Sequence, residues 1–349
     1  MFNTTSTNMK KVALIEFYPY HFELIHSQLL FLKADNYSPL FICDKQNSAN
    51  LEILKKIAPI ITYDFERIGS LFKLWQFLLK SHINYVVFNT AQGNRMVKFS
   101  LLPFPKKVKF LGILHNTNKL NTSFGQKIIN RKIKSYYVLA SYMQKFFPKK
   151  KSVKSVHINC AYPPKFKNST IQKPKNEIWL GIPGSIEYKR RDYDFLLKLA
   201  ADKLLPNNVK IVLLGNASKY EGPVLLKRIE ELGIEQRFIL FNHYVPDELF
   251  HYYMEALDFL LPLIHPMTLS ASAYLKHKVS GTFIQSYIYS KPMLCHNMFN
   301  NEHFEYTAHF YNTTIELIEY LKLNREAINV YAPVFEQDKA AYCNFLIDA

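Results

Sequence analysis

Leu257–Cys295 reads LDFLLPLIHPMTLSASAYLKHKVSGTFIQSYIYSKPMLC, and this stretch decides the fold class. Its first apolar run has the length of a buried strand and ends at Pro262, where a polar loop follows. The run after Ser280-Gly281-Thr282 has helical spacing, which predicts a helix over Thr282–Tyr289. Another short apolar run predicts a strand over Pro292–His296. Strand, helix and strand in this order indicate a βαβ unit and a parallel sheet.

The same alternation continues on both sides. In the N-terminal half the predicted strands are Lys11–Phe17, Ser38–Cys43, Pro59–Tyr63, Tyr85–Asn89, Phe110–His115 and Tyr136–Leu139. The predicted helices between them are Glu23–Lys33, Leu51–Ile57 and Ile68–Ser81. In the C-terminal half the further strands are Ile178–Ile182, Val209–Leu214 and Phe238–Phe241, and the further helices are Tyr193–Lys203, Gly222–Leu232 and Asp247–Ala256. Strands that alternate with helices are typical of a helix-covered parallel sheet.

The segment 162–176 separates the two series, because it is polar, holds three prolines and has no periodicity. We therefore expect an α/β protein with two Rossmann-like domains, over residues 1–165 and 175–312, that face a central cleft. Residues 313–349 are expected to form C-terminal helices, over Thr314–Leu323 and Asn324–Ile347, that pack back toward the N-terminal domain. Ligands of such proteins bind in the cleft.

The composition is that of a folded protein, with 48% hydrophobic residues among 349. No apolar run reaches the length of about eighteen residues that a membrane-spanning helix needs. The first residues lack the apolar middle section of a secretory signal. The cysteines have no metal-ligand spacing, so a reduced, cytoplasmic compartment is expected; they are Cys43, Cys160, Cys295 and Cys343.

The positive charge is concentrated in one half of the chain. Residues 1–170 hold 26 Lys and Arg against 7 Asp and Glu, a net +19, whereas residues 171–349 hold 18 against 21, a net −3. This division suggests that the N-terminal half faces something anionic, such as nucleic acid, a phospholipid surface or a phosphorylated substrate. The alternative is a general preference for lysine on solvated faces.

Ser280-Gly281-Thr282 has the features of a diphosphate site. Free backbone N–H groups at a helix start, together with the helix dipole, attract phosphate. Gly281 would let a ligand approach the backbone, the two hydroxyls could add donors, and Lys278 supplies a positive charge. Taken alone, the same residues are more typical of a helix cap than of a ligand site, and Thr282 and Gln285 even have capping-box spacing.

The C-terminal half resembles GT-B glycosyltransferases, especially the family-four-like members (glycosyl transferases group 1). The resemblance lies in Phe241–Tyr244, the strand that ends at Pro262, the Ser280–Thr282 helix start and the Lys291-Pro292 step. Gly184–Arg191 (GSIEYKRR) is similar to the basic loop of that family, and Leu213-Leu214-Gly215-Asn216 to its nucleotide-lining turn. The resemblance implies a set of donor-binding residues: Lys189, Arg190, Arg191, Gly215, Tyr244, Lys278, Ser280, Gly281, Thr282 and Gln285.

Two departures from the family pattern limit what the resemblance implies. The arginine of the first loop is replaced by Ser185, and the paired glutamates by His277 and Gln285. An amide at Gln285 could still bond the ribose hydroxyls, but it carries no charge, so a retaining or an inverting course stays open. No metal and no other cofactor is expected beyond the nucleoside diphosphate sugar itself.

The N-terminal domain would supply the acceptor side. His115 ends a predicted strand, at the carboxyl edge where ligands bind in open α/β sheets. His21 or Glu23 could serve as the base that takes the proton of the acceptor hydroxyl. A structural or surface role is the alternative for each of these three residues. Asn89–Asn94 also follows a strand and could line an acceptor groove.

The resemblance implies sugar transfer to a glycan or lipid-linked glycan, of the bacterial surface polysaccharide or lipopolysaccharide type. The enzyme would be cytoplasmic, or peripheral on the inner face of the membrane, because basic residues favour anionic lipid. The residues expected there are Lys106, Lys107, Lys109, Lys132, Lys134, Lys145 and Lys149–Lys151, with Phe146, Phe147 and the helix at Ile68–Ser81. Nucleic acid is not expected, since no recognition motif is visible. Three rivals remain: a sugar-nucleotide epimerase of GT-B shape, a non-enzymatic protein that binds nucleic acid or an anionic surface, and an inactive GT-B module.

Overall fold

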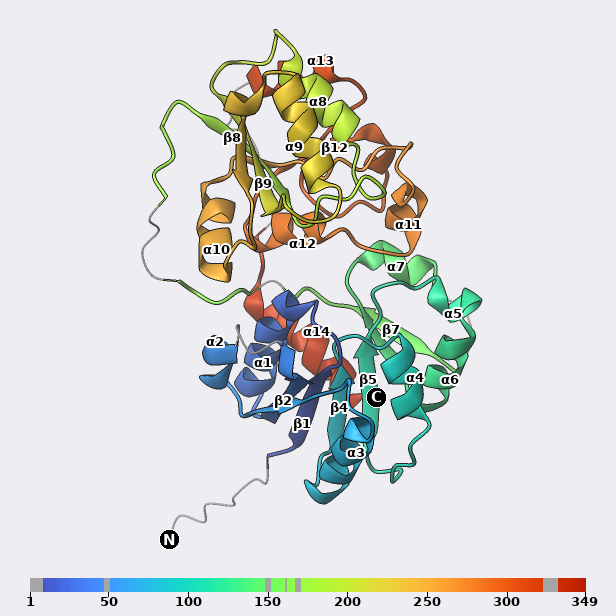
Figure 1. The fold of residues 1–349 in the computed structure, drawn as a ribbon. Coiled ribbons are helices and arrows are strands. Elements are labelled where there is room, and N and C mark those ends of the chain that lie inside the picture. The colour runs from blue at the N-terminus through green and yellow to red at the C-terminus, as the bar shows by residue number, and fades with distance from the viewer. Residues whose placement is uncertain (1–8, 47–50, 148–151, 161, 167–170, 323–331) are drawn as a thin grey trace. The chain divides into compact units, whose positions relative to one another are not determined.

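The structure, a computed structural model, describes residues 9–46, 51–147, 152–160, 162–166, 171–322 and 332–349. The chain divides into two compact units (Figure 1). The first unit runs to Pro164 and takes in Val334–Ala349, and the second runs from Lys165 to Pro333.

The described part of the first unit holds a seven-stranded, entirely parallel sheet in the order β3-β2-β1-β4-β5-β6-β7. Its strands are β1 (Lys11–Glu16), β2 (Ser38–Asp44), β3 (Ile60–Tyr63), β4 (Tyr85–Phe88), β5 (Lys109–Ile113), β6 (Ser135–Val138) and β7 (Lys154–His157). Its helices are η1 (Phe22–Leu24), α1 (Ile25–Ala34), α2 (Leu51–Lys55), α3 (Ser70–Lys80), α4 (Asn94–Ser100), α5 (Lys119–Thr122), α6 (Phe124–Lys132), α7 (Ser141–Lys145) and α14 (Phe335–Ile347).

The second unit repeats this plan with a six-stranded parallel sheet, again among the described residues, in the order β10-β9-β8-β11-β12-β13. Its strands are β8 (Ile178–Pro183), β9 (Val209–Asn216), β10 (Phe238–Phe241), β11 (Phe259–Leu260), β12 (Met293–His296) and β13 (Ala308–Tyr311). Its helices are α8 (Tyr193–Ala201), α9 (Gly222–Glu231), η3 (Glu235–Arg237), α10 (Asp247–Ala256), α11 (Ala271–Lys276), α12 (Gly281–Ile288), η4 (Asn297–Phe299) and α13 (Thr314–Lys322).

The central strands are apolar runs because helices cover both faces of each sheet. Every residue of β4 and of β8 is buried, and so is all of β1 except Lys11. The strand order reverses beside the first strand of each sheet, between β1 and β4 and between β8 and β11. In open α/β sheets this switch point, at the carboxyl ends of the strands, is where ligands bind.

The expectation of two Rossmann-like α/β domains is confirmed. The structure adds elements that the sequence pattern did not predict, namely β7, β13, α4–α7 and α11. Most of these helices are shorter than two turns and show no periodicity to detect, and the two strands are partly exposed sheet edges.

The two C-terminal helices belong to different units. α13 packs on α8 and β13 in the second unit, whereas α14 packs on α1 and β7 in the first. α14 begins at Phe335, and the earlier part of the predicted helix Asn324–Ile347 lies largely outside the described residues. None of the described helices has the length and hydropathy that a bilayer crossing requires.

Candidate active site

The start of α12 is capped and open to solvent. The Ser280 hydroxyl accepts a hydrogen bond from the backbone N–H of Thr282 at 3.3 Å, so Ser280 is the N-cap that the sequence suggested. Thr282 is buried, whereas Gly281 is exposed. A Cβ built at Gly281 would meet no atom within 4 Å. The Ser280 carbonyl oxygen accepts from the N–H groups of Phe283 at 3.0 Å and Ile284 at 3.4 Å, so among the described residues the Gly281 N–H is the first-turn donor left for an anion.

Arg191 joins this helix start to the carboxyl end of β8. Its guanidinium donates to the Ser185 carbonyl at 2.9 Å, to the Pro183 carbonyl, and to the Thr282 hydroxyl at 3.4 Å. Only 8% of Arg191 is exposed. The structure thus brings together two segments that are ninety residues apart in the sequence, and it gives Arg191 a positioning role beside the open helix end.

Lys189 and Arg190 form a surface pair on the same loop. The Lys189 amine lies 2.6 Å from one oxygen of Glu187, and the Arg190 Nε lies 3.4 Å from the other. Burial would raise the pKa of Glu187, but hydrogen bonds from Lys189 and Ser185 and the nearby Arg190 outweigh it and lower this pKa. The loop therefore holds three cations, including Arg191, and one carboxylate, Glu187, which leaves it with a net positive charge.

Two glycines shape the loop. Gly184 has φ of 100°, a left-handed conformation that favours glycine. A Cβ at Gly215, at the end of β9, would come within 2.1 Å of the Gly184 carbonyl oxygen. Gly215 is therefore required for the close approach of the two strand ends, in addition to any contact with a nucleotide.

The other residues expected to bind the donor have different surroundings. The Gln285 Oε1 is buried and accepts no hydrogen bond from the residues described. Gln285 lies one turn after Gly281 on α12. Lys278 is half-buried before the cap. Tyr244 is exposed on the loop after the edge strand β10, and its hydroxyl donates to Asp247 at 2.9 Å.

A buried network that sequence reasoning missed ties the loop before α12 to α8. His265 bonds the Asp192 carboxylate at 2.8 Å and the Tyr311 hydroxyl at 2.9 Å, and only 4% of it is exposed. The Asp192 backbone N–H donates to the Leu263 carbonyl at 2.8 Å, where Leu263 has a positive φ of 56°. Asp192 also caps α8. This network fixes the two loops that border the helix start.

Asp192 and Asp194 stand two positions apart, a spacing that can hold a metal ion in other proteins. Both carboxylates are engaged here, Asp192 by His265 and Asp194 by Arg228. Among the residues placed by the structure, no group of three or more His, Cys, Asp or Glu side chains could hold a metal ion.

The three residues expected to act in catalysis lie together at the switch point of the first unit. The rings of His21 and His115 stack, with centroids 3.8 Å apart and planes 18° from parallel. The Nδ1 of His21 lies 3.5 Å from a Glu23 oxygen. Burial lowers the pKa of His115 well below its usual value, and the neighbouring His21 and Lys119 lower it further, against a hydrogen bond to Asn89.

Glu16 ends β1 beneath this pair and was not anticipated. It is fully buried and accepts hydrogen bonds from the Tyr18 N–H at 2.9 Å, the Asn89 amide at 2.8 Å and the Thr90 hydroxyl at 2.7 Å. Burial raises the pKa of Glu16 to about 7, and these hydrogen bonds only partly oppose it. The Asn89 amide also donates to the His21 carbonyl at 2.9 Å, which holds His21 at a positive φ of 64°. An acidic residue at the end of an otherwise apolar strand was the available signal.

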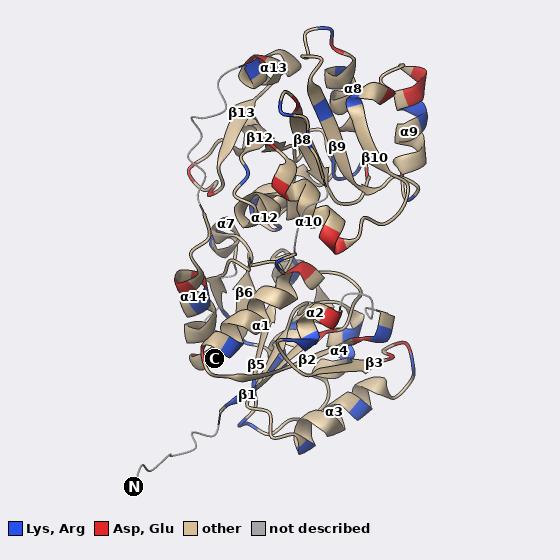
Figure 2. Cartoon of the chain, turned by 90° about the vertical axis from the view of Figure 1, so that its left-hand side faces the viewer, with Lys and Arg blue, Asp and Glu red and all other residues tan. Residues whose placement is uncertain are grey.

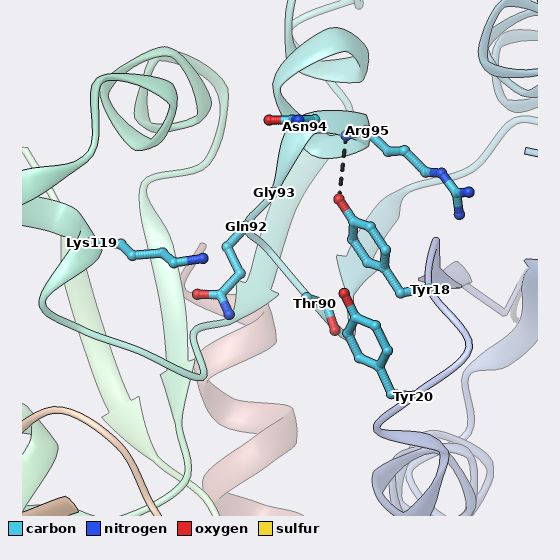
Figure 3. Close-up of a pocket in the computed structure, with 8 residues that line it drawn as sticks. All are labelled: Tyr18, Tyr20, Thr90, Gln92, Gly93, Asn94, Arg95 and Lys119. Atoms are coloured by element: carbon cyan, nitrogen blue, oxygen red, sulfur yellow. Dashed lines mark hydrogen bonds between the residues drawn. The ribbon is translucent and has the colours of Figure 1, made fainter. Parts of the chain in front are cut away.

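A cavity of about 370 Å³ opens beside these residues (Figure 3). Tyr18 and Tyr20 are stacked at 5.2 Å on one side, and Gln92 and Lys119 lie on the other. The backbone N–H of Lys119 donates to the Asn116 carbonyl at 3.3 Å, and its side-chain amine has no hydrogen bond or ion pair with the described residues. The Gln92 Oε1 is buried without a partner among them. The remaining lining residues are Thr90, Gly93, Asn94 and Arg95. Of the segment Asn89–Asn94, all but Asn89 and Ala91 line this cavity.

Solved structures of low sequence identity share this fold. HepE of Anabaena in complex with UDP-glucose is 15% identical, with 97% of this chain and 94% of that chain covered and a TM-score of 0.61. A glycosyltransferase of Rickettsia africae is 13% identical, with 98% and 94% covered and a TM-score of 0.58. A putative UDP-N-acetylglucosamine 2-epimerase of Listeria monocytogenes is 10% identical, with 97% and 91% covered and a TM-score of 0.61. No protein-family model and no curated protein matches the chain.

Two parallel sheets of Rossmann order, matched over nearly the full length of these structures, define the class: the chain has the GT-B fold of nucleotide-sugar glycosyltransferases. At these identities the likeness carries the fold and no particular activity. The activity has to be argued from the site.

Proposed function

We propose that the chain is a glycosyltransferase that moves a sugar from a nucleoside diphosphate sugar to a glycan or lipid-linked glycan. The observation that carries this proposal is the open α12 N-terminus beside a cationic loop at the switch point of the second unit. The GT-B fold supports it, and so does HepE, whose structure holds UDP-glucose.

In this proposal the Gly281 N–H and the positive end of the α12 dipole bind the diphosphate, while Lys189 and Arg190 neutralise its charge. Arg191 holds the helix start against the Ser185 loop and adds positive charge behind it. The unpartnered side-chain oxygen of Gln285 accepts a hydrogen bond from a ribose hydroxyl. Donors aimed at the leaving diphosphate stabilise the charge that develops as the sugar leaves, which is the main catalytic effect of such a site.

The first unit would hold the acceptor. The cavity offers two aromatic rings, hydroxyl and amide groups and one lysine, which suit a sugar with an anionic substituent. His21 would be the base, because a carboxylate beside one ring nitrogen favours the proton there and leaves the other nitrogen to take a proton from the acceptor hydroxyl. The four cysteines are free and buried, which fits a cytoplasmic enzyme.

Gly281 offers the sharpest test, since the structure leaves room for a side chain there. Gly281→Asp places a carboxylate where the diphosphate should lie and leaves the helix intact, because an acidic residue near a helix N-terminus is favourable. In a thermal-shift screen of UDP, GDP, CMP and dTDP sugars, the unmodified protein should show a rise in Tm that is selective for one nucleotide. Gly281→Asp should abolish this rise.

Gly281→Ala is the matched control, because a methyl group meets no neighbour and carries no charge. It should keep most of the nucleotide-dependent rise in Tm. If no nucleotide shifts the Tm of the unmodified protein, or if Gly281→Asp binds as well as Gly281→Ala, the donor site is not at this helix.

The epimerase remains a second candidate, because the Listeria structure matches the fold as well as HepE does. Incubation with the selected nucleotide sugar alone separates the two. An epimerase converts the sugar while the nucleotide stays attached, whereas a transferase releases the nucleoside diphosphate and is stimulated by an acceptor.

A further inference from the structure

Most of the positive charge of the N-terminal half comes from one long stretch without acidic residues, which runs past the end of the first unit. The 110 residues from Arg67 to Asn176 contain 22 Lys or Arg and no Asp or Glu. Surface ion pairs within this stretch are therefore impossible, and its lysines depend on acids from elsewhere or on an external partner. Figure 2 shows α3 with blue bands and no red one.

Large apolar side chains lie exposed in the same stretch. Ile68 is 105%, Phe72 48% and Leu101 65% exposed, and exposed apolar residues carry meaning where they gather in one patch. α3 buries its opposite face through Leu74 and Leu78, so the amphipathic helix is a core element with an apolar outer edge.

These exposed residues form one surface. The Phe72 ring contacts the Trp75 ring at 5.0 Å, and the Trp75 indole donates to the Pro103 carbonyl at 2.5 Å. Pro103 lies between Leu101 and the exposed lysines Lys106 and Lys107. We call the set Ile68, Phe72, Lys73, Leu101, Lys106 and Lys107 the α3 patch.

Some residues that the sequence suggested for a membrane-facing surface do not belong to the α3 patch. The Lys132 amine donates to the Leu102 carbonyl and lies 4.5 Å from the centroid of the Phe104 ring, and burial lowers its pKa to about 8. Phe147 packs against the core. Lys149–Lys151 lie outside the described residues.

We propose that the α3 patch docks on an anionic lipid bilayer. Apolar side chains surrounded by lysines are the combination that an interface of headgroups and acyl chains stabilises. Nucleic acid would use the lysines but would leave Ile68, Phe72 and Leu101 in water, since phosphate contacts carry most of its affinity. The inference deepens the proposed function, because a lipid-linked acceptor resides in such a bilayer, but it concerns a different surface and can fail separately.

Co-sedimentation of the full chain with vesicles tests the proposal. The protein should bind vesicles of phosphatidylcholine and phosphatidylglycerol in equal parts, release them as salt rises, and bind pure phosphatidylcholine far more weakly. Each lysine contributes about fivefold to the affinity. The triple variant Leu101→Ser, Lys106→Gln, Lys107→Gln should therefore bind about 100-fold more weakly, with part of the loss from the leucine.

A matched control removes the same residue types from the second unit, where Leu204 is 57% exposed: Leu204→Ser, Lys203→Gln, Lys322→Gln. This control should bind vesicles like the unmodified protein, and both variants should keep the nucleotide-dependent rise in Tm. Equal losses in the two variants, or no binding to anionic vesicles, would overturn the docking surface. So would tighter binding to a DNA or RNA duplex than to vesicles at the same salt.

Discussion

The hydrogen bond of His115 determines which of its ring nitrogens is free. Its Nε2 lies 2.8 Å from the Asn89 carbonyl oxygen, which can only accept, so Nε2 carries the proton and the lone pair of the neutral ring is on Nδ1. With its pKa held low, His115 stays neutral at neutral pH. Two rings stacked at 3.8 Å do not favour two positive charges, which agrees with a neutral His115.

We expect His21→Asn to lower kcat by about 100-fold or more, because a general base contributes roughly that factor. Glu23→Gln should have a smaller effect on kcat and little on KM for the donor, since it only orients the ring. Release of nucleoside diphosphate measures both effects. His243→Asn, on an exposed loop of the second unit, is the control and should retain full activity.

The raised pKa of Glu16 makes the free energy of unfolding fall as the pH rises through neutrality. Its pKa is about 7 in the folded protein and about 4.5 in the unfolded chain, so the folded state binds the proton more tightly. The stabilisation from this proton is fully present below pH 4.5 and is lost as pH rises through 7. The loss amounts to about 3 kcal/mol for this group.

The test is urea unfolding of the unmodified protein and of Glu16→Gln at pH 5 and at pH 8. Between pH 5 and pH 8 the free energy of unfolding should fall by about 3 kcal/mol more in the unmodified protein than in the variant, because the variant has no proton to release at this position. Glu235→Gln, at an exposed site, should follow the unmodified protein. A parallel pH dependence of Glu16→Gln and the unmodified protein would show that Glu16 is not buried as described.

At the scale of elements, α14 is joined by hydrogen bonds to the buried polar groups around Glu16 in the first unit. The Tyr342 ring stacks on Tyr137 at 4.7 Å, and its hydroxyl donates to Gln28 at 3.2 Å. The Gln28 amide in turn donates to Asn89 at 2.7 Å, and Asn89 binds Glu16 and the His21 carbonyl. A hydrogen-bonded chain therefore runs from the C-terminal helix to the stacked histidines.

Tyr342→Phe should lower the free energy of unfolding by about 1–3 kcal/mol, because it leaves the buried Gln28 oxygen without its donor. Tyr342→Ala should cost more, about 3–5 kcal/mol, since it also leaves a cavity. Urea denaturation measures both. Ile347→Ser, at the exposed end of the same helix, should change the stability by less than about 0.5 kcal/mol. If Tyr342→Phe is as stable as Ile347→Ser, α14 does not support the network.

Other elements show why sequence patterns located the sites but not their contacts. The end of β5, the start of α12 and the basic loop after β8 were all predicted, because a strand end followed by polar residues is a local signal. Asp192 and His265 gave no such signal. They are 73 residues apart and become partners only when α8 and the loop after β11 pack together.

At the scale of the whole molecule, the charge division and the fold follow from different properties of the chain. The alternation of apolar runs predicted two Rossmann-like units, and both have the order in which the sheet reverses beside its first strand. The excess of lysine has no part in that fold. In the first unit exposed Phe72 and Leu101 accompany exposed lysines, and the proposed membrane docking rests on this combination and not on charge alone.

The sequence by itself determined the fold class, the switch-point loops and the candidate residues at α12 and at the end of β5, because burial and helix capping leave periodic, local patterns. Only the tertiary structure decided which of those residues meet. Arg191 reaches Thr282, His21 stacks on His115, and Tyr342 bonds Gln28 across 314 residues. The tertiary structure also buries Glu16 and so raises its pKa, because the pKa of a carboxyl group depends on its surroundings in space and not on its neighbours in the chain. The physical reason is that packing joins distant segments, and no local pattern records which ones.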